Sequence, residues 1–367
     1  MDISTIDFRN LKCICLHGIK ISDTIDFSFN YHNGIKNIHF IPYSDFISKI
    51  DKSLFINIYE IQKCDIVVAI ENCRDNTLEV QAIKIAFSIV YFANRMNLEN
   101  HCSSRYIGFF NNYFLDGYNA FIDENKYIEH ASWFVKIGTS PLCNDDFDMW
   151  LPRIYGSNLD SQFNRRDGLE KCIQLNDINI KVDEGLLSNI DLIQNKINRN
   201  DQYSNKLLSV FRIYYSLLCD YADYEQNDIL FCTILESLLL KKGESDQRKK
   251  AATRAACIVA NNARIEKKKF IANNVYYFYS YRNSLIHDGK NILDFNEIEH
   301  YTVHTTIKHT IYYIIKSIVQ NDIKNPNDLI EIVKQNATKD KLAQAFDYID
   351  SDSIDNDYSK LEIIFNE

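Results

Sequence analysis

Hydrophobic and polar positions in the first half of the chain follow the short period of β-strands, with one helical exception. Residues 24–29 alternate with a period of two, which is typical of a half-buried strand, and 36–43 and 65–70 are further short apolar runs. Residues 77–96 are apolar on nearly every side and predict a buried helix. The aromatic-rich region 106–150 has no clear period, so no element is predicted there.

From about residue 200 onward, apolar positions recur at helical spacing. Leu207, Phe211 and Tyr214 begin this pattern, and four more segments of the same kind follow. The polar residues 195–204 lie where the period changes, so a domain boundary is expected there. The sequence therefore predicts the α+β class in three parts: a mixed α/β domain over 1–195, an all-helical domain over 200–335, and an acidic C-terminal tail over 336–367.

The composition is that of a globular protein with long regular elements. Of the 367 residues, 46% are hydrophobic and 25% are charged, which excludes disordered and collagen-like chains. Ten glycines and four prolines leave few positions that break helices. The ten cysteines are scattered through apolar segments, as the reduced core thiols of a cytoplasmic protein are.

Neither the start of the chain nor its apolar stretches predict a targeting or membrane segment. Residues 1–7 lack the basic region followed by an apolar one that a signal peptide needs. The most apolar stretches, 78–93 and 307–319, contain lysine or glutamate and are shorter than the ~20 residues of a membrane span. A cytoplasmic protein with no membrane partner is expected.

Net charge differs between the predicted parts of the chain. The whole chain carries −9, which argues against a protein that coats nucleic acid indiscriminately. Residues 201–335 contain 18 basic and 16 acidic residues, whereas 336–367 contain 3 and 8. Within the helical domain, 241–270 contains 10 basic and 3 acidic residues. Six of its cations are candidates for binding phosphate, with a solvated helix face as the alternative: Arg248, Lys249, Lys250, Lys267, Lys268 and Lys269.

No metal or cofactor site is predicted. Cys13, Cys15 and His17 share one face if they form a strand, but no fourth zinc ligand follows at a recognisable spacing. A core strand with small apolar thiols is the favoured interpretation. His300 and His304 share a helix face and lack a third ligand in the same way.

Residues 275–289 carry the most informative chemistry. They predict a helix that ends at Gly289, which places His287 in its last turn. Arg282 lies on or beside the apolar stripe, where an unpaired arginine is rare. Asn283 and His287 are four residues apart and share a face, so the amide is expected to hold one ring nitrogen.

An arginine beside a fixed histidine supplies what metal-free RNA cleavage needs. The imidazole takes a proton from the ribose 2'-hydroxyl or returns one to the leaving 5'-oxygen, and the guanidinium neutralises charge on the phosphate. DNA lacks that hydroxyl, so this chemistry selects RNA. The structural alternative is that Arg282 pairs with a buried acid and His287 only caps the helix.

Three motifs of the helical domain resemble one protein family. Residues 282–287 (RNSLIH) match the R-x4-H signature of HEPN domains, in its R-N-x3-H form. Residues 235–239 (LESLL) resemble the acidic second-helix motif of the Apea-like branch, and 251–256 (AATRAA) resemble its third-helix arginine motif. The aromatic run before the first motif and the His-Asp-Gly that closes it also match.

The resemblance covers roughly residues 200–320 and implies an all-helical bundle. Such domains form a homodimer, in which two R-x4-H motifs build one composite site. Active members are metal-independent endoribonucleases, many of them in toxin or anti-phage defence systems. By this resemblance, Arg282 is the phosphate-stabilising cation, His287 the acid and base, and Asn283 the residue that orients them. Asp288 stands where a glycine often follows, which adds negative charge near the phosphate.

Other residues are expected to support this site. Glu236 lies among leucines and needs a partner, which we expect to be Arg254 or Arg282. The six cations of 241–270 are then expected to bind RNA. One or two of the tyrosines between 276 and 281 are expected to stack on bases.

Three functional interpretations follow from the resemblance. The favoured one is a cytoplasmic ribonuclease of anti-phage defence (abortive infection) or a toxin, with RNA as substrate, no cofactor, and an N-terminal domain that is its sensor or its restraint. Its expected partners are a second copy of the chain and either an antitoxin or a phage-derived activator. The alternatives are an inactive HEPN module that binds a nucleotide or partner protein, and a toxin silenced by a nucleotidyltransferase that modifies a nearby tyrosine.

Overall fold

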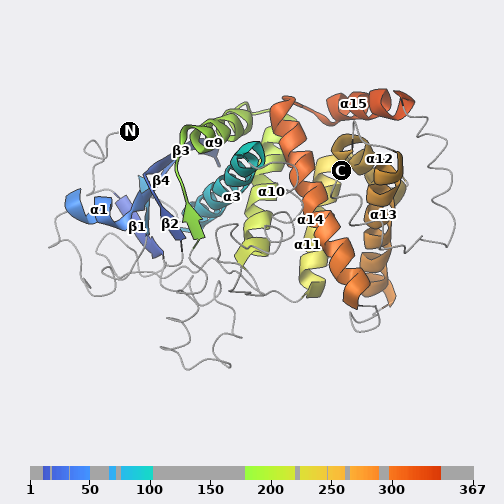
Figure 1. Ribbon diagram of the computed structural model, residues 1–367, viewed down its shortest axis with the longest axis horizontal. Coiled ribbons are helices and arrows are strands. Elements are labelled where there is room, and N and C mark those ends of the chain that lie inside the picture. Colours follow the sequence, from blue (N-terminus) through green and yellow to red (C-terminus); the bar gives the residue numbers. More distant parts are fainter. Residues whose placement is uncertain are drawn as a thin grey trace. The chain divides into compact units, whose positions relative to one another are not determined.

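The computed structural model of the protein shows two compact units (Figure 1). His17, the region 106–150 and residues 340–367 of the predicted tail lie outside the described part of the chain. The described residues are 11–16, 19–32, 34–49, 66–71, 76–101, 178–219, 224–245, 247–260, 265–288 and 297–339.

One of the points at which the chain passes from the first unit to the second lies between Asn198 and Arg199. This point lies inside the polar stretch where the hydrophobic period changes. Helix α10 (Gln202–Cys219) is divided, because its residues up to Ile213 belong to the second unit and those from Tyr214 onward to the first. The division inside α10 is a feature that the predicted boundary does not contain.

The first unit contains an antiparallel sheet of four strands and a separate parallel pair. Three of the sheet strands are those predicted at 24–29, 36–43 and 65–70. Their register places Ile38 opposite both Phe27 and Ile70. The sheet order is β1 (Leu11–Leu16), β5 (Ile66–Glu71), β4 (Gly34–Pro42) and β3 (Ile25–Tyr31), and the parallel pair is β2 (Ile19–Ile21) with β6 (Ile178–Ile180).

Alternation along β3 gives the sheet one apolar face. Every second side chain of this strand is buried, as a period of two requires. The ring of Phe40 lies between those of Phe27 and Phe87, with centroid distances of 5.0 and 4.6 Å. Phe87 belongs to α3 (Asn76–His101), which confirms the buried helix predicted over 77–96. Helix α1 (Tyr43–Lys49) follows β4 directly.

Strand β3 is an edge strand whose free backbone groups are bonded by side chains of helix α9 (Glu184–Ile197) and its C-cap residue. Gln194 Oε1 accepts a hydrogen bond from Ser28 N at 2.7 Å. Asn198 Oδ1 accepts from Asn30 N at 2.9 Å, and its Nδ2 donates to Ser28 O at 3.0 Å. These amides take the place of a neighbouring strand and block the edge from pairing with another chain.

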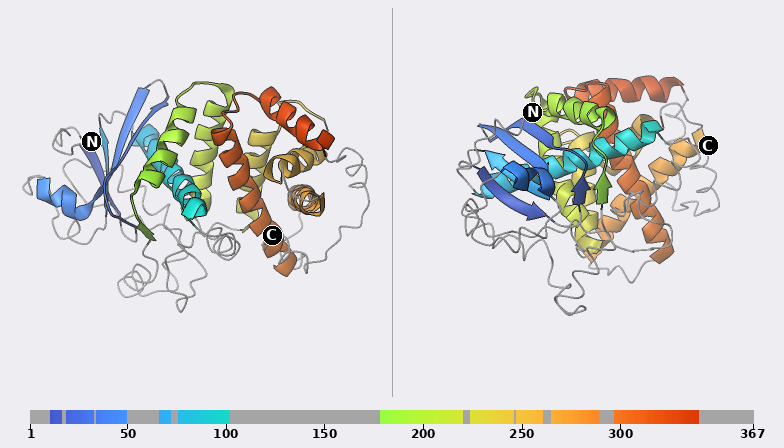
Figure 2. Two further views of the ribbon diagram at one scale, coloured as in Figure 1. Left: turned by 45° about the horizontal axis from the view of Figure 1, so that its top comes forward. Right: turned by 60° about the vertical axis from the view of Figure 1, so that its left-hand side comes forward.

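The second unit is helical wherever the structure describes it, which confirms the α+β class (Figure 2). None of the described helices is long and apolar enough to cross a membrane. Besides the first part of α10, its main helices are α11 (Tyr224–Leu239), α12 (Gln247–Val259), α13 (Ile265–Asp288), α14 (Glu297–Gln320) and α15 (Pro326–Lys339).

Side chains from α10 and α12 satisfy the carbonyl oxygens at the C-terminal end of α11. A helix leaves its last carbonyls without intrahelical partners, and these three are largely shielded from water. Each accepts a hydrogen bond from a different side chain, so three segments of the unit converge at this corner. The bonds run from Tyr203 to Leu238 (2.7 Å), from Arg254 to Leu239 (2.6 Å) and from Lys206 to Leu240 (3.3 Å).

Candidate functional site

The predicted catalytic residues all lie near the C-terminal end of α13. Arg282, Asn283 and His287 occupy its last two turns, and the helix ends at Asp288, immediately before the predicted cap Gly289. The supporting residues come from the helices beside it, since Glu236 lies on α11 and the predicted third-helix motif lies on α12. Figure 2 shows α12 and α13 adjacent within this unit.

Arg282 is half-buried, and its side chain makes one hydrogen bond within the described part of the chain. Its Nη1 donates to Asn283 Oδ1 at 3.1 Å, whereas its Nε is buried without a hydrogen-bond partner among these residues. A buried guanidinium nitrogen without an acceptor is costly, because a charged group loses water and gains nothing in return. The arginine is therefore held in place at a cost to stability.

Two buried groups report the charges around Arg282. Burial raises the pKa of the Cys232 thiol and that of the Tyr279 hydroxyl. In both cases the positive charge of Arg282 acts against this rise, and the negative charge of Glu236 adds to it. Arg282 and Glu236 therefore act on the same small region between α11 and α13, together with Asp228, whose charge also raises the Cys232 pKa.

The prediction that Glu236 pairs with Arg254 is wrong. That arginine instead makes a bidentate pair with Glu244, with distances of 2.7 and 2.8 Å, and also bonds the carbonyl of Leu239. Glu244 lies in the connection between α11 and α12, close enough for both of its oxygens to reach one guanidinium. These hydrogen bonds from Arg254 lower the pKa of Glu244 to about 2.

Glu236 makes no ion pair within 4.0 Å with Arg282 either, as far as the described residues extend. The two charges are neighbours without contact. The prediction of a direct Glu236 pair is therefore wrong for both candidate arginines, and the half-buried carboxylate contributes to the site through its field.

The expected bond between Asn283 and His287 is also absent from the described residues. The two share a face of α13, but the amide oxygen accepts from Arg282 instead. His287 is exposed and has no bonded partner in this part of the chain. The amide thus orients the cation of the motif rather than its imidazole, whose position is left to solvent or to a ligand.

The predicted basic patch does not form one continuous surface. Lys268 is fully buried because it shares the core-facing stripe of α13 with Ala272 and Val275, so its assignment to RNA binding is wrong for this structure. Its neighbour Lys269 is exposed. Lys267 also lies on α13, but its side chain is outside the described part.

The cations of α12 differ from one another in their surroundings. Lys249 and Lys250 are half-buried, and the charge of Lys250 contributes to the low pKa of the Glu244 carboxyl. Arg248 lies over the ring of Tyr276, with its guanidinium carbon 4.1 Å from the ring centroid. Its Nη1 also donates to Ser280 Oγ at 2.7 Å. All three cations lie in the first turn of α12, where the helix dipole favours negative charge.

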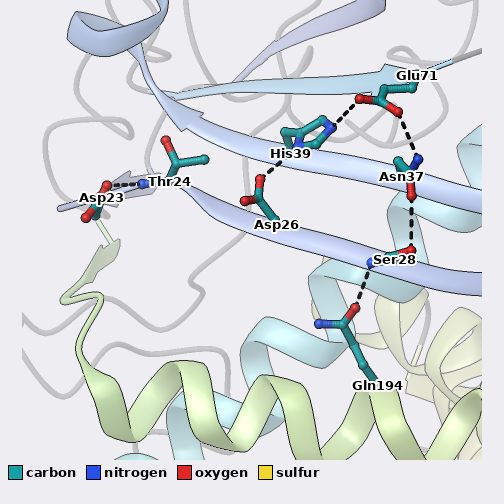
Figure 3. Close-up of polar contacts among 8 residues, drawn as sticks. All are labelled: Asp23, Thr24, Asp26, Ser28, Asn37, His39, Glu71 and Gln194. Atoms are coloured by element: carbon teal, nitrogen blue, oxygen red, sulfur yellow. Dashed lines mark hydrogen bonds and ion pairs between the residues drawn. The ribbon is translucent and has the colours of Figure 1, made fainter. Parts of the chain in front are cut away.

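A second polar cluster lies on the sheet of the first unit (Figure 3). It was not predicted from the sequence. His39 is buried, with Nδ1 2.7 Å from Asp26 Oδ1 and Nε2 3.3 Å from Glu71 Oε1. Asn37 Nδ2 donates to Glu71 Oε2 at 2.8 Å, and Asn37 Oδ1 accepts from Ser28 Oγ at 3.0 Å. The usable signal was the alternation that places these polar positions on one face of three neighbouring strands.

The chemistry of this cluster is that of a closed network. Only an imidazole protonated on both nitrogens donates to both carboxylates. Burial raises the pKa of Asp26, but the hydrogen bond and the charge of His39 outweigh that effect and leave it lowered. The described residues contain no group of three His, Cys, Asp or Glu side chains arranged to hold a metal ion.

Comparison of the chain with protein-family models, curated proteins and solved structures found no match.

Proposed function

We propose that the second unit is a metal-independent endoribonuclease of the HEPN type. The observation that carries this proposal is the end of α13, where a half-buried guanidinium, whose Nε has no partner among the described residues, lies five residues before an exposed imidazole. A cation retained at a cost is typical of a site that binds an anion, and the exposed imidazole nearby is accessible for proton transfer. The three-motif resemblance agrees with this chemistry.

The proposed reaction uses the ribose 2'-hydroxyl of the substrate. An imidazole nitrogen of His287 removes the hydroxyl proton while the 2'-oxygen forms a bond to phosphorus. The bond from phosphorus to the 5'-oxygen breaks, and that oxygen takes a proton from a second imidazolium. Arg282 neutralises the charge that grows on the non-bridging phosphate oxygens. The products end in a 2',3'-cyclic phosphate and a 5'-hydroxyl.

We propose a homodimer because this reaction needs one base and one acid at the same phosphate. His287 of each copy would supply one of them. Ile286, which precedes the histidine, is 45% exposed although it is a large aliphatic residue. An exposed apolar side chain within the motif suits contact with a second copy. The physiological setting that we favour is anti-phage defence or a toxin, with the first unit as the sensor.

The test is cleavage of a defined single-stranded RNA by the full chain in the presence of EDTA. Cleavage should persist, yield 2',3'-cyclic phosphate ends, and disappear when each 2'-hydroxyl is methylated, because the nucleophile is then absent. The His287→Ala variant should be inactive, with exposed Arg212→Ala on α10 as the matched surface control. A requirement for a divalent metal, or full activity in His287→Ala, would overturn the proposal.

One observation favours an inactive binding module as the second candidate. Asn283 bonds Arg282 and leaves the imidazole of His287 unfixed, whereas a poised general base is normally oriented by a partner. Expression in a bacterial host separates the two candidates. Growth arrest by the wild type that is relieved in Arg282→Ala supports the enzyme, and equal tolerance of both proteins supports the module.

A further inference from the structure

We propose that Arg248 is a preformed phosphate-binding residue that holds the RNA backbone next to the Arg282 and His287 site. This inference rests on the proposed RNA substrate, but it concerns binding and not cleavage. It goes beyond the charge-based expectation for 241–270, because it selects one cation and gives it a position relative to the reacting phosphate. The other cations of that stretch are not assigned this role.

The guanidinium of Arg248 is fixed by two contacts with α13. It stacks on the ring of Tyr276 at 4.1 Å, and its Nη1 donates to Ser280 Oγ at 2.7 Å. Ser280 Oγ in turn donates to the carbonyl of Tyr276 at 3.0 Å, which sets the direction of the hydroxyl. A stacked and bonded arginine loses little further freedom when it binds an anion, because its planar fork is already oriented.

The remaining edge of this guanidinium is open. Nε and Nη2 of Arg248 have no bonded partner among the described residues, and neither is buried. No acidic side chain in that part of the chain forms an ion pair with Arg248, and Glu244, in the connection before α12, is paired with Arg254. An arginine that presents two N–H groups side by side matches two oxygens of one phosphate.

The position of Arg248 relative to the motif follows from helical spacing. Its two contacts, Tyr276 and Ser280, are followed on α13 by Asn283 and His287 at intervals of three and four residues. These spacings place all four residues on one face of the helix. Ser280 and His287 are seven residues apart, which corresponds to about 10 Å along the axis. Arg248 therefore lies too far away for the scissile phosphate and in place for a neighbouring one.

The alternative is that Arg248 only ties α12 to α13. If Arg248 only links the two helices, its substitution should lower the melting temperature and leave the RNA affinity of the folded protein unchanged. A phosphate-binding residue predicts lower affinity and a weaker dependence on salt, because each phosphate contact to a single strand contributes about 0.7 to the slope of log affinity against log salt. The two interpretations therefore differ in the RNA affinity of the folded protein and in its dependence on salt, which a change in stability alone does not alter.

The experiment measures binding of the full chain to a fluorescein-labelled, fully 2'-O-methylated 20-nucleotide RNA at several salt concentrations. The methyl groups prevent cleavage through the 2'-oxygen, so affinity is measured without turnover. Arg248→Gln should bind about tenfold more weakly, with a slope smaller by about 0.7. Arg212→Gln removes the same charge from an exposed position on α10 and should match the wild type.

Arg248→Lys separates charge from geometry. It should keep the slope and bind about threefold more weakly, because a lysine has no planar fork for the phosphate. Should Arg248→Gln fail to fold, this variant decides the question by its affinity alone. An affinity equal to that of the wild type in the folded Arg248 variant, or no RNA binding by the wild type, would overturn the inference.

Failure of this inference is distinct from failure of the proposed function. Unmethylated RNA is offered to the same proteins for that purpose. Cleavage that depends on His287, with an unchanged slope in Arg248→Gln, keeps the ribonuclease and overturns the phosphate contact. A reduced slope in a protein that does not cleave RNA keeps the contact and overturns the ribonuclease.

Discussion

The sheet of the first unit and the end of α13 in the second each present a histidine among charged and amide side chains, but they satisfy these groups differently. His39 is buried, and both of its ring nitrogens face a carboxylate. His287 is exposed and has no bonded partner in the described chain, and Arg282 beside it keeps a buried nitrogen unbonded. A closed network stabilises a fold, whereas open bonding capacity suits a site that waits for a ligand.

The comparison is wrong if Arg282 and His287 serve the stability of the fold instead of a ligand. Arg282→Met should reduce RNA cleavage by about 10²- to 10³-fold, as the loss of a donor to a developing anion does. Its melting temperature should stay the same or rise, because the buried Nε contributes no hydrogen bond. Single-turnover cleavage and thermal unfolding of the same samples measure both. A clearly lower melting temperature would place Arg282 among the structural residues.

The paired charges of the second unit should behave in the opposite way. Arg254→Met removes the partner of Glu244 and the bond to Leu239, and should lower the free energy of unfolding by about 3 kcal/mol. Chemical denaturation measures this loss. The variant should still bind the methylated RNA when folded, and a loss of affinity without a loss of stability would contradict the structural role.

The pH dependence of this pair has a definite sign. The pKa of Glu244 is lowered to about 2, so the stability that the pair provides is fully present above the ordinary value of about 4.5 and declines as pH falls toward about 2. Glu244→Gln should therefore be less stable than the wild type at pH 6, and the difference should shrink steadily in acid. If the difference in stability between Glu244→Gln and the wild type stays constant as pH falls, the stability that the pair provides does not depend on the charge of Glu244.

The sheet network provides a smaller version of the same test. His39→Gln keeps a polar side chain but cannot bond both carboxylates, and should cost about 2 kcal/mol. Because the pKa of Asp26 is lowered from 3.8, the contribution of its bond to His39 is present above that value and is lost as pH falls below it. Denaturation at pH 6 and pH 3 measures both effects. RNA cleavage by the folded variant should remain at the wild-type level.

The sequence predicted the strands and helices that have a hydrophobic period of their own. It did not predict contacts that depend on the register between strands or on the connections between helices. The strands at 24–29, 36–43 and 65–70 and the helix at 77–96 each carry their own hydrophobic pattern, so they were predictable. The His39 network required the alignment of three strands, which no single segment specifies.

The site was predictable to the same extent. The spacing of Arg282, Asn283 and His287 placed them on one helix, as found. The bonds between side chains did not follow from spacing, because Asn283 had two neighbours to choose from and Glu244 lay in a connection without a period. Burial of Lys268 was missed because a run of three lysines suggests an exposed face, although the helical stripe of α13 includes one of them.

The smallest predicted effect concerns the edge of the sheet. Asn198→Ala removes two hydrogen bonds to β3, both exposed to solvent, and should cost about 1 kcal/mol. Gln194→Ala removes one partly buried bond and should cost a similar amount. The double variant leaves the edge of β3 unprotected, so it should also self-associate at high concentration, because unpaired edge strands pair with other chains. Denaturation and light scattering measure the two effects. If the double variant stays at the size of the wild type, the amides of Gln194 and Asn198 serve stability alone and do not protect the edge.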